Sequence, residues 1–285
     1  MLLDAMRRNL IAAALLALGF ALHPAARLAA QDMAVDLELV LAVDVSGSID
    51  AEEFKLQRQG YASAFRDPRL LQAIYSGPLQ RIAVTLVDWA GAEYQTISIG
   101  WTLIEDESSA EKFADAILKA PRPFARWTSL SGAIDFCAPL FDNNSFASVR
   151  KVIDISGDGV NNSGRPAIPA RDAAVARGIT INGLVMSGVT LDQVAPWRSL
   201  EDYFTKNVIG GQGAFVIAAE NIADFRRAVL TKLIREVADL PPGAPGVLGV
   251  LGTQGVQGAP NITRSAASPR GEGMRLALSL ADETP

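Results

Sequence analysis

Five side chains that carry oxygen occur in three short segments, each following a predicted strand or preceding a predicted helix. The first segment holds Asp44, Ser46 and Ser48, the second holds Thr128, and the third holds Asp158. Carboxylates and hydroxyls are hard donors, which suit Mg²⁺, Mn²⁺ or Ca²⁺ and disfavour metals that prefer sulfur or imidazole. We therefore predict a divalent-cation site, with Mg²⁺ as the first choice and Mn²⁺ or Ca²⁺ as alternatives.

The geometry of an extended chain supports this grouping. Alternate residues of a strand face the same way, so Asp44 and Ser46 begin on one side. Gly47 lets the backbone turn, so that Ser48 can swing back toward them. Asp158 follows another apolar strand and Thr128 precedes a helix, so all three segments are expected at one edge of a sheet.

Apolar runs predict strands over 37–45, 81–89, 94–101, 150–156, 179–186 and 214–218. Helices are predicted over 107–120, 129–141, 168–177 and 222–238, and another begins at Asp50, which forms a capping box with Glu53. This alternation predicts an α/β fold with a doubly wound, mostly parallel central sheet and helices on both faces. The tight turn after residue 89 predicts one antiparallel strand, at an edge.

Asp-x-Ser-x-Ser after a buried strand, a later Thr and a later Asp-Gly together resemble the metal-ion-dependent adhesion site of von Willebrand factor A domains. The segments VIDISGDGVNN and RWTSLSGAID also resemble those of a bacterial branch of exported A-domain proteins with no assigned role. The resemblance covers residues 36–238 and implies a Rossmann-like fold.

The same resemblance implies a role for each residue of the site. Ser46, Ser48 and Thr128 would contact the metal directly, whereas Asp44 and Asp158 would act through waters or hold the hydroxyls. One coordination position would stay open for a carboxylate from a partner protein.

Three further residues have both a functional and a plain interpretation. Asp154 shares a strand face with Ser156, and it either orients the metal ligands or forms a structural hydrogen bond, which its depth favours. Asn161, like its neighbour Asn162, either lines the ligand surface or satisfies a turn. Trp127 either forms part of a binding rim beside Thr128 or packs in the core.

The two ends of the chain differ from the middle. Residues 1–30 are predicted to be a signal peptide, because Arg7 and Arg8 precede an apolar run over 10–22 and cleavage is expected near Ala30. The protein is then expected in the periplasm or secreted, with no membrane span after cleavage. Residues 241–285 are rich in Gly and Pro, which predicts a disordered tail.

Composition excludes several functions. Cleavage of residues 1–30 would leave 23 basic and 30 acidic residues, a net charge of −7, which argues against nucleic acid as a partner. The only histidine, His23, lies in the predicted signal peptide, so the mature chain has no Ser-His-Asp machinery and no usual zinc site. The only cysteine, Cys137, forms no intrachain disulfide and is expected to be a buried apolar residue.

These observations favour a binding module over an enzyme. The leading hypothesis is an exported adhesion or scaffold protein that captures an acidic residue of a partner through a bound cation. The alternatives are a metal-assisted phosphoryl hydrolase, which would need Asp158, and an A domain whose metal is purely structural. The sequence does not indicate the oligomeric state.

Overall fold

The computed structural model describes residues 32–123, 126–142, 144–186, 196–220 and 222–238. The strands are β1 (Met33–Ala34), β2 (Leu37–Asp44), β3 (Ile82–Trp89), β4 (Gln95–Ile104), β5 (Phe146–Ala147), β6 (Lys151–Gly157), β7 (Ile179–Met186) and β8 (Val216–Ala219). The helices are α2 (Ala51–Phe65), α3 (Pro68–Tyr75), α4 (Glu107–Lys119), α5 (Leu130–Cys137), the 3₁₀ helix η1 (Ala138–Phe141), α6 (Ala167–Ala176), α8 (Leu200–Asn207) and α9 (Ile222–Val237). The predicted signal peptide and the predicted tail lie outside the described residues.

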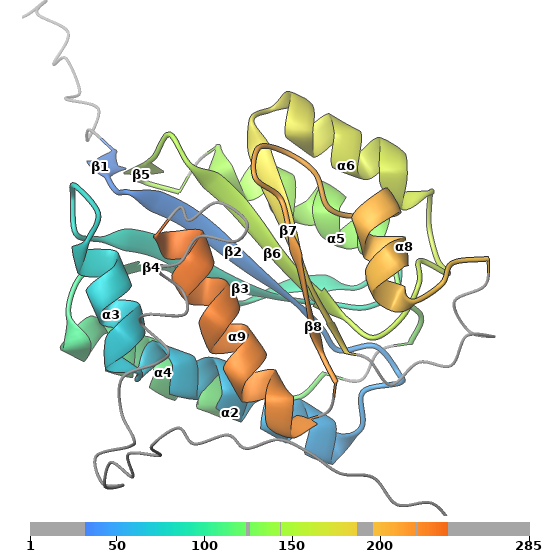
Figure 1. Ribbon diagram of the computed structural model, residues 1–285, viewed down its shortest axis with the longest axis horizontal. Coiled ribbons are helices and arrows are strands. Elements are labelled where there is room, and N and C mark those ends of the chain that lie inside the picture. Colours follow the sequence, from blue (N-terminus) through green and yellow to red (C-terminus); the bar gives the residue numbers. More distant parts are fainter. Residues whose placement is uncertain (1–31, 124–125, 143, 187–195, 221, 239–285) are drawn as a thin grey trace, which may run out of the picture.

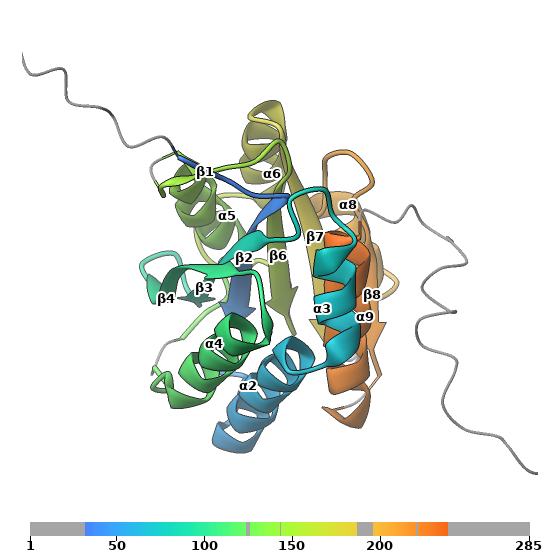
Figure 2. The ribbon, with the colours of Figure 1, turned by 90° about the vertical axis from the view of Figure 1, so that its left-hand side faces the viewer.

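A six-stranded sheet forms the middle of three layers, with the strand order β4-β3-β2-β6-β7-β8. Helices α2, α3, α4 and α9 cover one face, and α5, α6 and α8 cover the other (Figures 1 and 2). All strand pairs of this sheet are parallel except β3 with β4. The predicted fold class is therefore confirmed, including the antiparallel strand at an edge.

The sheet is centred on β2, in which all eight residues are buried. Asp44 pairs with Trp89 of β3, and Val43 pairs with Ser156 of β6. The carboxyl ends of these three parallel strands therefore lie level with one another. Loops that leave these ends start close together, which is the arrangement that the predicted site requires.

Some predicted boundaries and elements were wrong. The single helix predicted over 129–141 is α5 followed by η1, because Pro139 cannot donate to an α-helical hydrogen bond. Two helices, α3 and α8, were not predicted from the sequence. Both are only eight residues long, and so short an amphipathic segment gives a weak periodic signal.

The loop after β2 ends in a well-capped helix. The Asp50 carboxylate accepts hydrogen bonds from the backbone N–H groups of Glu52 and Glu53, at 2.8 and 2.9 Å, and the Glu53 side chain accepts one from Asp50 N. This capping box fixes where α2 begins. It therefore also fixes the length of the turn that carries Ser46 and Ser48.

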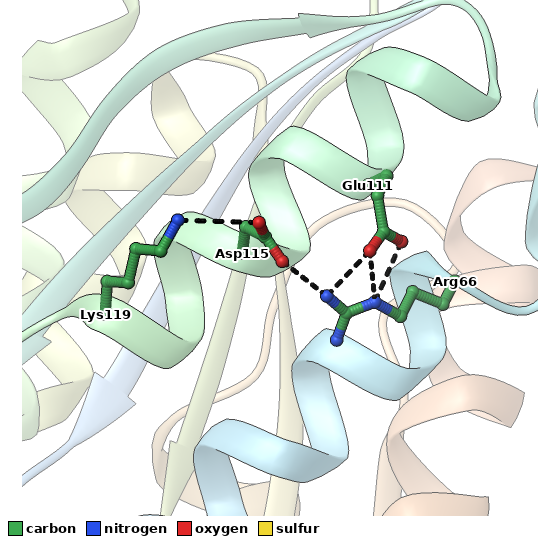
Figure 3. A network of polar contacts seen from close by, with 4 residues as sticks. All are labelled: Arg66, Glu111, Asp115 and Lys119. Carbon is green, nitrogen blue, oxygen red and sulfur yellow. Dashed lines mark hydrogen bonds and ion pairs between the residues drawn. The ribbon is translucent and has the colours of Figure 1, made fainter.

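A surface network joins α2 to α4 (Figure 3). The Arg66 guanidinium lies 2.8 Å from Glu111 and 2.6 Å from Asp115, and Lys119 lies 3.4 Å from the other oxygen of Asp115. Each exposed ion pair of this kind contributes little to the stability of the fold, because water and salt screen the charges. The packing of α2 against α4 therefore depends mainly on the buried apolar residues beneath the network, such as Phe65 and Phe113.

No helix in the described part of the chain is long and apolar enough to cross a membrane.

Cys137, the last residue of α5, is fully buried in the core. Burial raises the pKa of its thiol, so the group stays protonated and behaves as the small apolar residue that the sequence predicts.

A buried ionic cluster anchors α9 to the sheet. Lys232 has no exposed surface, and its Nζ lies 2.5 Å from Asp154 of β6 and 2.5 Å from Glu236. Asn182 of β7 donates to Glu236 at 2.9 Å. Two carboxylates thus share one ammonium group in the interior, where a buried charge without a partner is strongly unfavourable.

We expect Lys232→Met to lower the free energy of unfolding by about 3–5 kcal/mol, because it leaves Asp154 and Glu236 buried without a counter-ion. Urea unfolding would measure the change. Lys206→Met is the matched control, since Lys206 pairs with Asp202 at the surface, and it should change stability little. Equal, small effects of the two substitutions would show that the buried cluster does not stabilise the fold.

Glu236 should make stability depend on pH. Burial raises its pKa from 4.5 to about 7, and the charge of Asp154 adds to the effect, against the opposing influence of Lys232. Between these values the folded chain keeps a proton that the unfolded chain has lost. The stabilisation is therefore present below pH 4.5 and is lost as the pH rises through 7.

The thermal midpoint of Glu236→Gln should accordingly fall less than that of the natural chain between pH 4.5 and 7. Glu201→Gln, on the exposed surface of α8, serves as the control and should keep the natural slope. An unchanged slope in Glu236→Gln would contradict the assignment.

Candidate metal centre

Asp44 ends β2 and has no exposed surface. Its Oδ1 accepts a hydrogen bond from Ser46 N at 2.7 Å, and its backbone carbonyl accepts one from Gln57 Nε2 at 3.2 Å. Its Oδ2 is buried and has no hydrogen-bond partner. A Cβ added to Gly157 of β6 would lie 3.2 Å from this oxygen, so glycine leaves the space beside it open.

Ser46 and Ser48 lie on the turn that follows Asp44. Their hydroxyl oxygens are 3.1 Å apart, and the Ser48 hydroxyl donates to Asp158 Oδ1 at 2.9 Å. Asp158 is 110 residues further along the chain and follows β6. The structure therefore brings together the first and third predicted segments.

Thr128 reaches the same place through the loop before α5. Its N–H donates to Asn162 Oδ1 at 2.8 Å, and its carbonyl accepts from the N–H groups of Asn162 and Ser163, at 2.9 and 3.1 Å. Thr128 Oγ1 is 3.6 Å from the position that a Cβ on Gly159 would take. Its hydroxyl thus lies beside the residue that follows Asp158, and the side chain is almost fully buried.

The two carboxylates of the site lie in an electrostatically unfavourable position. Burial raises the pKa of Asp44 to about 7, and the charge of Asp158 raises it as well, although hydrogen bonds from Ser46 oppose the shift. Burial also raises the pKa of Asp158, with a contribution from the charge of Glu53 and an opposing hydrogen bond from Ser48. Both groups would be more stable as anions if a positive charge lay beside them.

The other buried carboxylates of the described chain have such a charge or a set of donors. Asp88 lies 2.5 Å from Arg58, and Asp154 and Glu236 share Lys232. Glu38 accepts hydrogen bonds from Asn144 and from Ser148 N. In the described residues, Asp44 and Asp158 form no ion pair with any Lys or Arg, so this part of the chain supplies no counter-ion here.

The donor set fits a hard divalent cation. The residues present are two carboxylates and three hydroxyls, and one buried carboxylate oxygen is unpartnered. No group of three or more His, Cys, Asp and Glu in the described residues could hold a metal ion. A cation at this place would therefore depend on Ser46, Ser48 and Thr128 for part of its coordination.

The three residues with two interpretations lie in different environments. Asp154 forms an ion pair with Lys232 of α9, where the structural interpretation expected a hydrogen bond to a neighbouring loop. Asn161 accepts from Ser131 N at 3.1 Å and donates to two backbone carbonyls, so it satisfies the turn. Trp127 is 67% exposed and lies beside Thr128, not in the core.

The sequence did not predict the positioning roles of two residues: Asn162 was expected only to line the ligand surface or to satisfy a turn, and Gln57 was not singled out. Asn162 fixes the Thr128 loop through a pair of hydrogen bonds, and Gln57 of α2 holds the carbonyl of Asp44. Both are amides in polar surroundings, and their spacing carries no signal. Only the folded arrangement places Asn162 opposite a residue 34 positions earlier.

A family model described as "Protein of unknown function (DUF1194)" matches residues 34–241. The chain belongs to this family. No curated protein matched the DUF1194 chain.

Solved structures show which fold the DUF1194 chain has. It is 16% identical to proximal thread matrix protein 1 from the mussel byssus (TM-score 0.50, 72% of this chain and 47% of that one). It is 13% identical to the pilus adhesin SpaC from Lactobacillus rhamnosus GG, with a TM-score of 0.54 over 72% of this chain and 31% of that one. It is also 13% identical to a von Willebrand factor type A protein from Catenulispora acidiphila, with a TM-score of 0.52 over 72% of this chain and 43% of that one. The chain spans less than half the length of each. At these identities the likeness shows the fold alone, which is that of a von Willebrand factor A domain.

The unpartnered carboxylate predicts an unusual mutational effect. In cation-free buffer at pH 8, Asp44→Asn should raise the free energy of unfolding by about 1 kcal/mol or more, because it removes a buried charge that faces Asp158. Asp88→Asn is the matched control: it leaves Arg58 buried without its partner and should lower the same quantity by about 3 kcal/mol. Chemical unfolding in EDTA would measure both. A loss of stability in Asp44→Asn as large as that in the control would mean that the carboxylate is already compensated.

Proposed function

We propose that this DUF1194 chain is an exported, metal-dependent protein-binding module. It holds a divalent cation, Mg²⁺ first, through Ser46, Ser48, Thr128, Asp44 and Asp158, and it captures a carboxylate of a partner protein. The observation that carries the proposal is Asp44 Oδ2, which is buried, ionisable and without a partner beside a second uncompensated carboxylate. A bound cation would supply positive charge at this place, and that charge would attract an anionic ligand.

The residues of the chain have separable tasks in this proposal. Asp44 holds the turn through Ser46 N, and Asp158 accepts from the Ser48 hydroxyl, so both carboxylates orient hydroxyl groups as well as carrying charge. Asn162 orients Thr128 through its backbone. Because hydroxyls are neutral, they would quench the charge of a cation less than carboxylates would. The site would therefore keep an attraction for an outside carboxylate.

A role in binding agrees better with these residues than catalysis does. The chain has one histidine, at position 23, and one cysteine, which is buried with a raised thiol pKa. Cys137 is buried in the core and cannot serve as a nucleophile beside Asp158, and His23 lies in the predicted signal peptide. Two of the proteins with the same fold are described as a thread matrix protein and a pilus adhesin, which supports an adhesion or scaffold role outside the cytoplasm.

Thermal unfolding in a Mg²⁺ or Mn²⁺ titration tests the cation. At a concentration 100 times the dissociation constant, binding should stabilise the natural chain by about 2.7 kcal/mol. Ser46→Ala should lose most of this gain while it unfolds at the natural temperature in EDTA. Ser76→Ala, which removes a hydroxyl bonded to Ala73 O at the end of α3, should keep the full gain. An absence of stabilisation by Mg²⁺, Mn²⁺ and Ca²⁺ in the natural chain would refute the proposal.

Paired peptides test the partner's carboxylate. Two immobilised peptides that differ only in carrying Asp or Asn are compared. In Mg²⁺ the Asp peptide should retain more of the protein than the Asn peptide, and in EDTA the two peptides should retain equal amounts. A chain that Mg²⁺ stabilises but that never discriminates Asp from Asn would hold a purely structural cation.

A further inference from the structure

Trp127 is the most exposed aromatic side chain among the exposed large apolar residues of the described chain. Its side chain is 67% exposed, whereas the other three tryptophans are buried or partly buried. It directly precedes Thr128, one of the proposed cation ligands. A large indole ring in contact with water at this position gains little from packing in the free protein.

The backbone of Trp127 is also strained. Its φ is +64°, a left-handed conformation that is unfavourable for a bulky side chain and ordinary for glycine. Two hydrogen bonds to the end of β3 hold this conformation: Gly91 N donates to Arg126 O at 3.0 Å, and Ser129 N donates to Ala90 O at 2.7 Å. A Cβ on Gly91 would lie 2.8 Å from Arg126 O, so the two segments are in close contact.

The two hydrogen bonds use backbone atoms and do not need an indole ring. One edge of the ring lies over Gly91, because its Cδ1 is 3.7 Å from the position that a Cβ on Gly91 would take. Glycine at position 127 would adopt the same φ without strain, and the exposed ring buries little surface. The fold therefore uses only a small part of the ring, and most of its surface stays in contact with water. Strained residues cluster at ligand-binding positions, where an exposed ring contributes when a ligand covers it.

We propose that Trp127 selects the partner by stacking against an aromatic or large apolar side chain next to the carboxylate that the cation site receives. This inference rests on the proposed function and gives the partner segment a second feature. The segment carries an acidic residue for the site of Asp44 and Asp158 and an apolar neighbour for the ring. Thr128 links the two, because its side chain lies at the cation site and its backbone continues directly into Trp127.

A peptide array can test the selection. The probes are immobilised peptides Gly-Ser-X-Asp-Gly-Ser and Gly-Ser-Asp-X-Gly-Ser, in which X is Trp, Tyr, Leu, Gly, Ser or Lys, with Asn in place of Asp as the blank. In Mg²⁺, the natural chain should bind the best peptide with X as Trp, Tyr or Leu about tenfold more tightly than the peptide with X as Gly. Trp127→Gly should lose this preference and still bind the X = Gly peptide as the natural chain does. Trp127→Phe should keep part of the preference.

Thermal unfolding separates this role from a structural one. Trp127→Gly should unfold at the natural temperature or above it, since it relieves the left-handed strain, and Mg²⁺ should stabilise it as before. Tyr75→Ala is the control: Tyr75 is an exposed aromatic residue at the end of α3, and its removal should leave the peptide preference unchanged.

The outcomes are distinct for the two proposals. Binding that needs Mg²⁺ and Asp, but shows no apolar preference or keeps that preference in Trp127→Gly, overturns the selection by Trp127 and leaves the proposed function standing. A clear loss of thermal stability in Trp127→Gly also overturns it, because the ring would then serve the fold. A natural chain that Mg²⁺ does not stabilise and that binds no Asp peptide overturns both.

Discussion

Two carboxylates, those of Asp44 and Asp158, lie at the carboxyl edge of the sheet, close enough for the charge of Asp158 to raise the pKa of Asp44, and no basic side chain among the described residues pairs with either. Burial and mutual repulsion raise the pKa of Asp44 to about 7. An interior charge without compensation is strongly unfavourable unless something outside the chain supplies the opposite charge. The hydroxyls of Ser46, Ser48 and Thr128 lie near these carboxylates and add oxygen donors that suit a hard cation.

The parallel sheet is what makes this arrangement possible. β2 lies between β3 and β6 in parallel register, so the loops after Asp44 and Gly157 leave the sheet at the same height. The Thr128 loop then joins the end of β3 to the loop after β6, through Ala90 on one side and Asn162 on the other. The three segments meet because the strands pair in parallel register and because hydrogen bonds hold the Thr128 loop between them.

Much of this could be predicted from the sequence, because long apolar runs and alternating elements report directly on a buried parallel sheet. The run 37–45 predicts β2 to within one residue, and the order of the Asp, Thr and Asp-Gly segments predicts where they meet. Helices α3 and α8 are too short to give a clear period. Asn162 could not be assigned, since its role depends on an encounter with a loop 34 residues away. The ion pair of Asp154 with Lys232 could not be predicted either, because α9 comes next to β6 only in the folded chain.

Asp154 and Asp158 differ in whether a positively charged side chain lies beside the carboxylate, and this difference decides which of them stabilises the fold. Both acids belong to the same short segment, at β6 and just beyond it, and the alternation of a strand predicts that they share a face. The ammonium group of Lys232 lies beside Asp154, so that charge is balanced within the protein and anchors α9. Asp158 accepts a hydrogen bond from the hydroxyl of Ser48, which orients it without neutralising it. The same residue type thus stabilises the fold where a buried lysine lies beside it, whereas at Asp158 the described residues leave a negative charge that the proposed cation would balance.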